Sequence, residues 1–102
     1  MLTVTSLDAP AQMLADPLRA RIVELLAHET MCTCHLVVET GARQTTVSHH
    51  LHILREAGWV ECEPCGRFTY YRLCPEPLAA LAASVDALAR SAAVAAGRRR
   101  PC

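Results

Sequence analysis

The sequence predicts a mainly helical protein with one β-hairpin, arranged as a winged helix-turn-helix of five helices and a two-stranded wing. Three observations support this fold class. Asp16-Pro17 is a strong helix start, because Asp accepts unpaired backbone N–H groups and Pro favours the first helical position. Two short helical segments flank a turn at residues 41–43, and two strands rich in aromatic residues precede a long Ala-rich helix.

Capping residues and glycines set the expected boundaries of the first four helices. Asp8 is expected to cap the first helix, and apolar residues then recur at helical spacing after Pro17. Gly41 and Gly58 are expected to end the third and fourth helices. The helices are expected at about residues 8–15, 16–27, 33–40 and 44–57.

The hairpin and the last helix follow. Residues 59–63 and 68–73 are expected to form two strands, joined by a turn at 64–67 that places Arg67 at its tip. A C-terminal helix is expected at about 76–95, with apolar residues alternately three and four apart, a spacing typical of a helix that packs against a partner helix. These residues are Leu78, Leu81, Val85, Leu88, Ala92 and Ala95.

Composition limits the class of protein. We expect one domain over residues 1–102, with the helix-turn-helix at about 33–57, the wing at about 59–73 and a dimerisation helix at about 76–95. Hydrophobic residues make up 52% of the chain, but no uninterrupted apolar run approaches the roughly 18 residues of a membrane span, so we expect no membrane partner. The N-terminus lacks the pattern of a signal peptide, which favours a cytoplasmic location.

The formal net charge is zero, so any affinity for DNA must come from the local placement of charges.

The fourth helix has one apolar face and one polar face. At about 100° per residue, Val47, Leu51 and Leu54 fall on one side, which is expected to pack. The opposite face is polar and compact enough to enter a major groove. His50 leans toward the packed side and is expected to be structural. The residues expected to contact DNA are Gln44, Thr45, Thr46, Ser48, His49, His52 and Arg55 in this helix and Arg67 in the wing.

Cys32-Thr33-Cys34 has the spacing of a chelating pair at a helix start. Two residues apart in a regular helix point about 200° from each other and could not share one ion. Cys32 is instead expected to be the N-cap, outside the helix, with Cys34 in its first turn. Thiols at helix N-termini have a lowered pKa, so both are expected as thiolates, which prefer soft ions.

Five segments together resemble the ArsR/SmtB family of metal-responsive bacterial repressors. They are residues 14–19, 31–36, 46–51, 54–58 and 66–73, and the resemblance covers about residues 12–90. It implies a homodimer, joined through its first and last helices, that binds an inverted-repeat operator in double-stranded DNA. It also implies that the Cys-x-Cys segment is an arsenic/antimony site, or part of a cadmium/lead site.

The chain departs from the family pattern at three places. The third Cys usual in arsenite-type sites is replaced by Val37, the Ser that often caps the recognition helix is replaced by Arg43, and no His follows His52 to build a zinc site on the last helix. Candidates for a third ligand are Cys102, then Cys62, Cys65 and His35, or a small-molecule thiol. Cys74, at a strand end, is expected to be structural.

These observations predict a dimeric repressor released from its operator by arsenite or antimonite bound at Cys32 and Cys34. The alternatives are a cadmium, lead or zinc sensor of the same fold and a thiol-redox-sensing repressor. An enzyme is disfavoured, because the chain has no parallel-sheet pattern and no Cys motif at a strand-to-helix turn. The dimer interface is expected at Leu78, Leu81, Val85 and Leu88.

Overall fold

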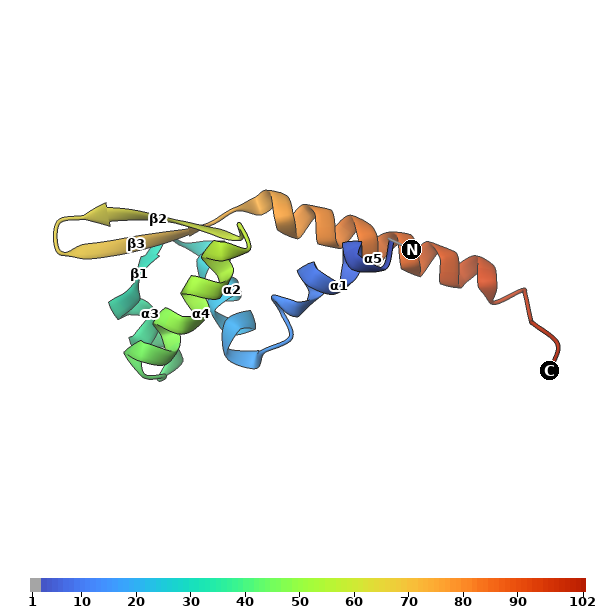
Figure 1. Ribbon diagram of the computed structural model, residues 1–102, viewed down its shortest axis with the longest axis horizontal. Helices are drawn as coiled ribbons and strands as arrows, with labels where there is room; N and C mark the ends of the chain where they lie inside the picture. Colours follow the sequence, from blue (N-terminus) through green and yellow to red (C-terminus); the bar gives the residue numbers. More distant parts are fainter. Residues whose placement is uncertain (1–2) are drawn as a thin grey trace.

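The computed structural model describes residues 3–102 and has five helices and three strands (Figure 1). This architecture confirms the predicted mainly helical fold with a hairpin wing. In chain order the elements are α1 Thr3–Gln12, α2 Pro17–His28, β1 Met31–Cys32, α3 Thr33–Thr40, α4 Gln44–Glu56, β2 Val60–Cys65, β3 Phe68–Leu73 and α5 Pro75–Ala95.

Most helix boundaries lie where the capping residues indicated. Asp16 is the N-cap of α2, and its carboxylate accepts hydrogen bonds from the backbone N–H groups of Leu18 and Arg19 at 2.9 and 3.1 Å. Gly41 ends α3 with a φ of 72°, a left-handed conformation that favours glycine. The first helix was predicted wrongly: α1 begins at Thr3, so Asp8 lies within the helix and is not its cap. It ends at Gln12, shortly after Pro10, which cannot donate a backbone hydrogen bond.

The wing belongs to a three-stranded antiparallel sheet with the strand order β1-β3-β2. Strand β1 was not predicted, because it has only two residues, too few for an alternating pattern. It pairs Met31 with Tyr71 and Cys32 with Tyr70. The hairpin turn is also tighter than expected, since β2 continues through Pro64 to Cys65 and leaves only Gly66 and Arg67 between the strands. The pairing ties the start of α3 to the wing.

A single cluster of buried side chains holds α2, α3, α4 and the base of the wing together. Its fully buried members come from three helices: Ile22, Leu36, Val47, Leu51 and Leu54. Trp59, 3% exposed, closes the cluster next to the wing; its backbone N–H donates to Leu54 O at 2.8 Å and its carbonyl accepts from Cys74 N at 2.8 Å. The recognition helix and the wing therefore share one rigid base.

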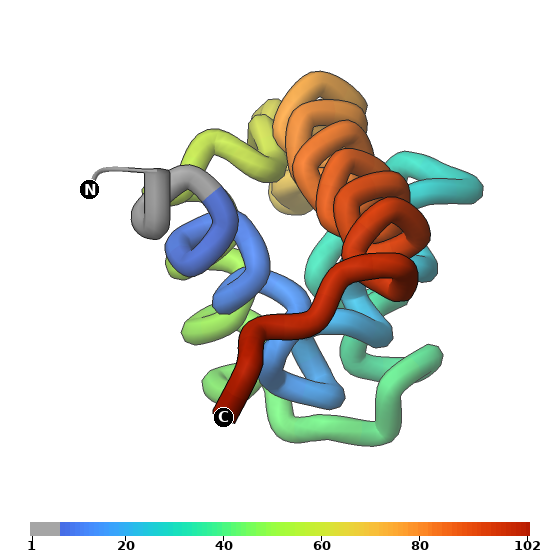
Figure 2. The backbone as a smooth tube through the Cα atoms, turned by 90° about the vertical axis from the view of Figure 1, so that its right-hand side faces the viewer, coloured from blue at the N-terminus to red at the C-terminus, as the bar shows by residue number. Residues whose placement is uncertain are grey.

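Helices α1 and α5 extend away from this core. They come from opposite ends of the chain but contact each other along their length, and α5 projects beyond α1 toward the C-terminus (Figures 1 and 2). The molecule measures 62 × 24 × 23 Å. Most of α5 is exposed, including the apolar side chains of Val85, Leu88 and Val94.

The expectation that no segment is apolar enough for a membrane span needs correction. Helix α5 has 21 residues and a mean hydropathy of 1.5 over an 18-residue window, so by length and composition alone it could cross a membrane. No uninterrupted apolar run occurs in α5, but its many alanines raise the mean hydropathy around its few charged residues. One of these, Asp86, forms an ion pair with Arg90 one turn later.

Candidate DNA and metal sites

The polar face of α4 is open to solvent. All residues of α4 that were expected to contact DNA are exposed, namely Gln44, Thr45, Thr46, Ser48, His49, His52 and Arg55. The opposite face is buried, with Val47 and Leu54 each 0% exposed. Helix α4 packs on α3 across the turn that begins at Gly41. This is the arrangement of a helix-turn-helix whose second helix presents side chains to a major groove.

The N-terminus of α4 has no side-chain cap. Arg43 occupies the N-cap position in an extended conformation, and its side chain makes no capping hydrogen bond. The turn between α3 and α4 is stabilised by Thr40 at the end of α3. Its Oγ1 donates to Leu36 O at 2.7 Å and accepts from Ala42 N at 3.2 Å. Unpaired N–H groups at the start of α4 therefore remain available, in a position where helix N-termini commonly meet phosphate.

His50 connects the recognition helix to the start of α2. It is 8% exposed, which agrees with the structural role expected from its place on the helix. Arg19 Nη1 lies 3.1 Å from His50 Nδ1, and because a guanidinium only donates, Nδ1 is the acceptor and the ring is neutral. Its other nitrogen lies 3.6 Å from Asp16 Oδ1. Burial lowers the pKa of His50, with the charge of Arg19 acting in the same direction and that of Asp16 opposing it.

Arg19 also holds the end of α1. Its Nε donates to Met13 O at 3.0 Å and its Nη2 to Gln12 O at 2.8 Å. One guanidinium thus joins α1, α2 and α4. No role was predicted for the Arg19 side chain. The available signal is a basic residue within the first turn of a helix, where its charge opposes the helix dipole.

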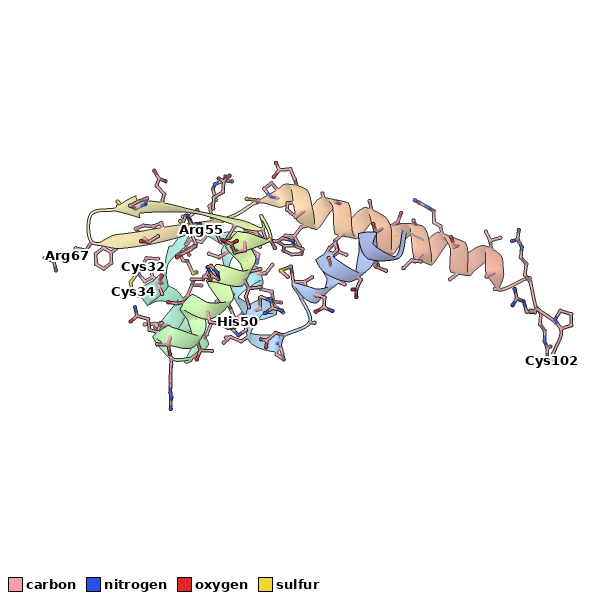
Figure 3. All side chains as sticks on the ribbon, viewed as in Figure 1. Cys32, Cys34, His50, Arg55, Arg67 and Cys102 are labelled. Carbon is pink, nitrogen blue, oxygen red and sulfur yellow. A yellow bond between two sulfur atoms is a disulfide. The ribbon has the colours of Figure 1, made fainter. Side chains whose placement is uncertain are left out.

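Arg67 lies at the tip of the wing and points away from the body of the protein (Figure 3). It is exposed, and it follows Gly66, whose φ of 63° permits the two-residue turn. Nearer the base of the wing, Arg72 on β3 forms an ion pair with Glu61 on β2, which raises the pKa of Arg72. Arg67 is therefore the basic side chain that the hairpin carries farthest from the core.

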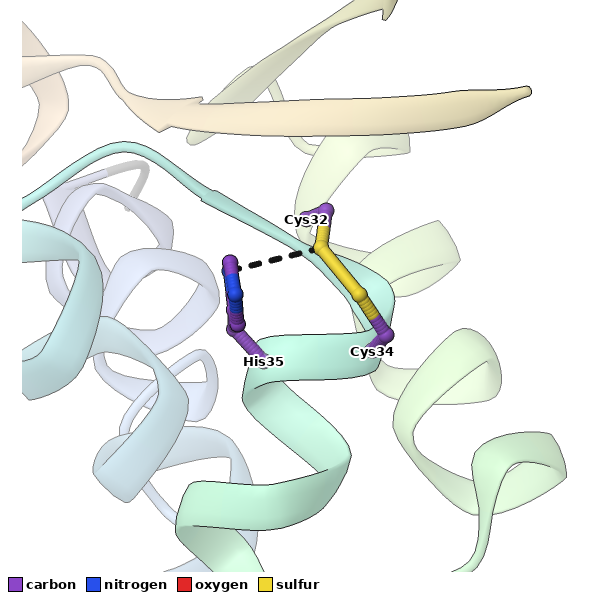
Figure 4. Close-up of a disulfide and its surroundings, with 3 residues drawn as sticks. All are labelled: Cys32, Cys34 and His35. Carbon is purple, nitrogen blue, oxygen red and sulfur yellow. Dashed lines mark hydrogen bonds between the residues drawn. A yellow bond between two sulfur atoms is a disulfide. The ribbon is translucent and has the colours of Figure 1, made fainter.

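Cys32 and Cys34 meet at the start of α3. Cys32 is the N-cap, as expected, with extended backbone angles that turn its side chain back toward the first turn of the helix. The two Cα atoms are 5.4 Å apart, and the sulfurs form a disulfide (Figure 4). The expected pair of thiolates is therefore replaced by the oxidised pair, because the same proximity that lets two sulfurs share an ion lets them bond to each other.

His35 stands beside this pair. Its Nδ1 lies 3.4 Å from Cys32 Sγ, and the ligand atoms of Cys32, Cys34 and His35 all lie within 4.8 Å of one another. Cys32 is buried, at 2% exposed, whereas Cys34 and His35 face solvent. These three residues form a group that could hold one metal ion at the surface.

The other candidate ligands lie away from this group. Cys102 is at the opposite end of the molecule from Cys32 and Cys34 (Figure 3). Helix α5 continues to Ala95, as expected, and carries the tail that ends at Cys102 away from α3. Cys62 and Cys65 lie on β2, which is separated from β1 by β3, and Cys65 is exposed. Cys74 is buried at the start of α5, and burial raises the pKa of its thiol, which agrees with a structural role.

The residues expected at a dimer interface divide into two sets. Leu81, 8% exposed, belongs to the core of its own chain, and Leu78 packs against that core. Val85 and Leu88 are 52% and 55% exposed. Along this side of α5 runs an open apolar groove of about 480 Å³, lined by Leu14, Leu78, Leu81, Ala82, Val85, Asp86 and Ala89.

Comparison with known proteins agrees with this geometry. Residues 16–61 match the model of bacterial regulatory proteins of the arsR family. The chain is 36% identical over 74 residues to an HTH-type transcriptional regulator of Methanocaldococcus jannaschii, an alignment that covers 72% of this chain and 83% of that protein. The chain belongs to the arsR family. Its relatives are transcriptional regulators and not enzymes, and this family member has their DNA-binding winged helix-turn-helix.

Other relatives of this arsR-family protein carry effector names. It is 44% identical over 64 residues to the arsenic resistance transcriptional regulator of Pseudomonas putida, covering 62% of this chain and 50% of that one. It is 36% identical over 61 residues to the cadmium resistance transcriptional regulatory protein of Listeria innocua, covering 59% and 51%. The chain thus spans about half the length of these two relatives.

Solved structures show the same fold. A possible transcriptional regulator for arsenical resistance superposes with a TM-score of 0.71 at 38% identity, covering 78% of this chain and 82% of that one. The homodimeric winged helix-turn-helix domain of a possible ArsR-family regulator from Mycobacterium bovis superposes with a TM-score of 0.67 at 27% identity, covering 97% and 91%.

Proposed function

We propose that this arsR-family repressor is a dimer that leaves its operator when trivalent arsenic or antimony binds Cys32 and Cys34. The observation that carries the proposal is the meeting of two sulfurs at the N-terminus of α3, the helix on which the recognition helix packs. Relatives named for arsenic resistance support this choice of effector. Thiolates are the ligands that soft ions prefer.

The operator would be read by α4 and the wing. The exposed side chains of His49 and Ser48 lie on the polar face of α4, and Arg67 reaches outward from the wing tip. Base-edge contacts from α4 would provide sequence specificity, while Arg67 would add a contact to the backbone or a narrow minor groove. A twofold arrangement of two such surfaces fits an inverted repeat.

The second subunit would cover the apolar groove of α5. Val85 and Leu88 are large apolar side chains that the chain itself leaves exposed, and the similar domain from M. bovis is described as homodimeric. Val85→Asp would bury a charge in this interface and should give monomers that fail to hold an inverted repeat. Sedimentation of the variant measures this directly, and an unchanged dimer would place the interface elsewhere.

Release would begin at the start of α3. In the reduced protein the two sulfurs are not bonded to each other, and an ion held by both would fix their separation and so change the backbone between Cys32 and the first turn of α3. Because α3 supports α4, the two recognition helices would lose the spacing that the operator requires. The ion can act only if it binds the DNA-free conformation more tightly. A coupling free energy of about 3 kcal/mol would weaken DNA binding roughly 150-fold.

Trivalent arsenic binds three sulfurs, so a third must join Cys32 and Cys34. Cys102 of the same chain is remote, which leaves Cys102 of a second subunit or a small cellular thiol. Val37, one turn after Cys34, is half-buried and packs against the core. Val37→Cys should therefore place a third thiol one helical turn from Cys34 and tighten arsenite binding in the absence of added thiol.

The test is a titration of fully reduced protein on its own promoter DNA with arsenite. DNA binding, followed by fluorescence anisotropy, should be lost on addition of arsenite for the wild type and retained for Cys34→Ser. The hydroxyl of Cys34→Ser leaves the fold and the DNA surface intact, so basal DNA affinity serves as the control. A wild-type arsenite response in Cys34→Ser would exclude the proposed site.

A second candidate function is thiol-redox sensing, favoured by the disulfide between Cys32 and Cys34. Hydrogen peroxide would accept two electrons from the two thiols, forming the disulfide and two molecules of water. Operator affinity measured for the reduced and the oxidised protein without any metal separates the two functions. Equal operator affinities for the reduced and the oxidised protein would exclude redox sensing and leave metal sensing as the one proposed function.

A further inference from the structure

We infer that Arg19 and His50 are positioning residues that fix the recognition helix α4 relative to the second subunit, and thereby determine which spacing of operator half-sites the dimer accepts. In an inverted repeat, the half-site spacing mirrors the distance between the two recognition helices. The inference rests on the proposed function, because it requires two subunits that read an inverted repeat. It involves neither the two thiols nor the side chains that face DNA.

The guanidinium of Arg19 lies between the end of α1 and the recognition helix. Its Nε donates to Met13 O at 3.0 Å and its Nη2 to Gln12 O at 2.8 Å. Its third nitrogen, Nη1, donates to His50 Nδ1 at 3.1 Å. All three nitrogens of one planar group are therefore used, and they hold α4 at a fixed distance from the end of α1. A lysine ammonium lacks this planar fork and could not reproduce the three bonds.

The α1 end of this link borders the apolar groove on α5. Leu14, the residue after Met13, is 37% exposed and lines the groove together with Val85. The second subunit would cover this groove, so Arg19 binds the backbone directly beside a side chain of the proposed interface. The positive charge suits this place, because helix C-terminal carbonyls carry partial negative charge and α1 has no basic residue in its own last turn.

The α4 end of the link lies directly behind the DNA-facing surface. His50 is 8% exposed and faces the start of α2 (Figure 3). The next side chain, His49, is exposed on the polar face of α4, and the two rings are 5.4 Å apart, edge to face. A displacement of His50 therefore moves both α4 and a side chain that would contact the operator.

The link depends on a directional hydrogen bond to a neutral ring. Because Nδ1 accepts from Arg19, the ring proton is on Nε2, which lies 3.6 Å from Asp16 Oδ1. The positive charge of Arg19 and the negative charge of Asp16 already balance around the ring. A side chain at position 50 must therefore supply an acceptor at the place of Nδ1, and an apolar side chain of similar size would fill the space without making the link.

The experiment compares three kinds of operator duplex in anisotropy titrations of the reduced full chain. They are the complete inverted repeat found by footprinting on the protein's own promoter, a single half-site, and the repeat with its centre lengthened or shortened by one base pair. Arg19→Lys keeps the charge but loses the fork of hydrogen bonds. It should bind the complete repeat roughly 2- to 30-fold more weakly, the range for substitutions that alter coupling without touching a ligand. It should bind the half-site like the wild type and distinguish the natural from the altered spacing less well.

Arg21→Lys is the matched control, because Arg21 is exposed on the same helix and pairs with Glu24 at 3.5 Å. It should equal the wild type on every duplex. His50→Leu removes the acceptor and should behave like Arg19→Lys, whereas His50→Asn places a carbonyl oxygen near the position of Nδ1 and should restore the preference for the natural spacing. Equal losses on the complete repeat and the half-site would mean that the pair only stabilises the fold, and would overturn the inference. Wild-type binding of all duplexes by Arg19→Lys and His50→Leu would overturn it as well.

A second measurement needs no DNA. Nitrogen-15 NMR of the histidine side chains should show His50 as a neutral ring protonated at Nε2, with Nδ1 as a hydrogen-bond acceptor, and this acceptor signature should disappear in Arg19→Lys. A ring protonated at Nδ1 would overturn the inference. A wild-type protein that sediments as a monomer, or that binds the half-site as tightly as the complete repeat, would instead overturn the proposed dimeric repressor, so the two failures are distinguishable.

Discussion

Helix α2 begins at Asp16, whose carboxylate accepts hydrogen bonds from the backbone N–H groups of Leu18 and Arg19, whereas α3 begins at Cys32, whose side chain caps nothing. Both N-caps have extended backbone angles, so the difference lies in the side chain alone. Asp16 fixes its helix and faces His50 of the recognition helix. Cys32 leaves the N–H groups of α3 unpaired by side chains and directs its sulfur toward Cys34. The start of α2 therefore stabilises its helix, whereas the start of α3 leaves two sulfurs available for the proposed ligand.

The largest expected effect comes from giving α3 the kind of start that α2 has. Cys32→Ser supplies a hydroxyl that can cap α3, so the fold and operator affinity should persist. The response to arsenite or Cd²⁺ should disappear, because one of the two thiolates is lost. Ion titrations of the reduced variant on operator DNA measure this, and persistence of ion-driven release would show that Cys32 has no part in binding.

The converse change removes the cap of α2. Asp16→Ala loses both capping hydrogen bonds and the partner of His50, so the midpoint of thermal unfolding should fall by roughly 4–8 °C. Asp16→Asn is the matched control, since its side-chain oxygen can still accept from Leu18 and Arg19. The ion response should survive in both variants. Equal midpoints for Asp16→Ala and the wild type would mean that the cap does not stabilise this helix.

A smaller effect is expected at the uncapped start of α4. Arg43→Ser should add a capping hydrogen bond and stabilise the DNA-free protein by about 0.5 kcal/mol. Loss of the positive charge should at the same time weaken operator binding at low salt. Denaturant unfolding and salt-dependent anisotropy measure the two effects. A destabilised variant would show that Arg43 has contacts beyond the capping position.

The smallest effect is a pH dependence at His50. Its pKa in the folded protein lies below the ordinary value of 6.5, because burial disfavours the charged ring. Below pH 6.5 the unfolded chain therefore binds a proton that the folded protein does not, so stability should fall as the pH drops from 6.5 through the folded pKa. The charged groups facing the ring are Asp16 and Arg19, with His49 beside it. His50→Gln should remove this slope in unfolding measured between pH 5 and 7.

Most helices could be predicted from the sequence because their boundaries depend on local chemistry. Asp16-Pro17 and Gly41 carry their structural preference in the residue itself, and the periodicity of α4 predicts its buried face, including His50. The two-residue strand β1 could not be predicted in this way. It exists because Met31 and Cys32 lie next to Tyr71 and Tyr70 of the distant β3, a contact that no local pattern contains.

The candidate sites were foreseen unevenly for the same reason. The Cys-x-Cys pair and the polar face of α4 are local patterns, and the structure places those residues together. The place of His35 beside Cys32 depends on the N-cap geometry and was only one of several alternatives. The links from Arg19 to Gln12 and His50 join three helices, so spacing along the chain could not indicate them. The distance of Cys102 from Cys32 depends on the direction in which α5 leaves the core, which spacing along the chain does not contain.

The docking of α1 on α5 has a consequence for hydrogen exchange. Among the α1 side chains that the structure describes, residues 7–12, none is fully buried. The helix contacts α5, Leu7 packs against the core, and Arg19 donates one hydrogen bond to Gln12 and one to Met13 just beyond the helix. It can therefore detach while the buried cluster of α2, α3 and α4 stays closed. Its amides should exchange through this local opening, whereas amides near Ile22 and Leu51 should exchange only when the whole chain unfolds. Limited proteolysis should accordingly cut first at residues 13–15, between α1 and α2.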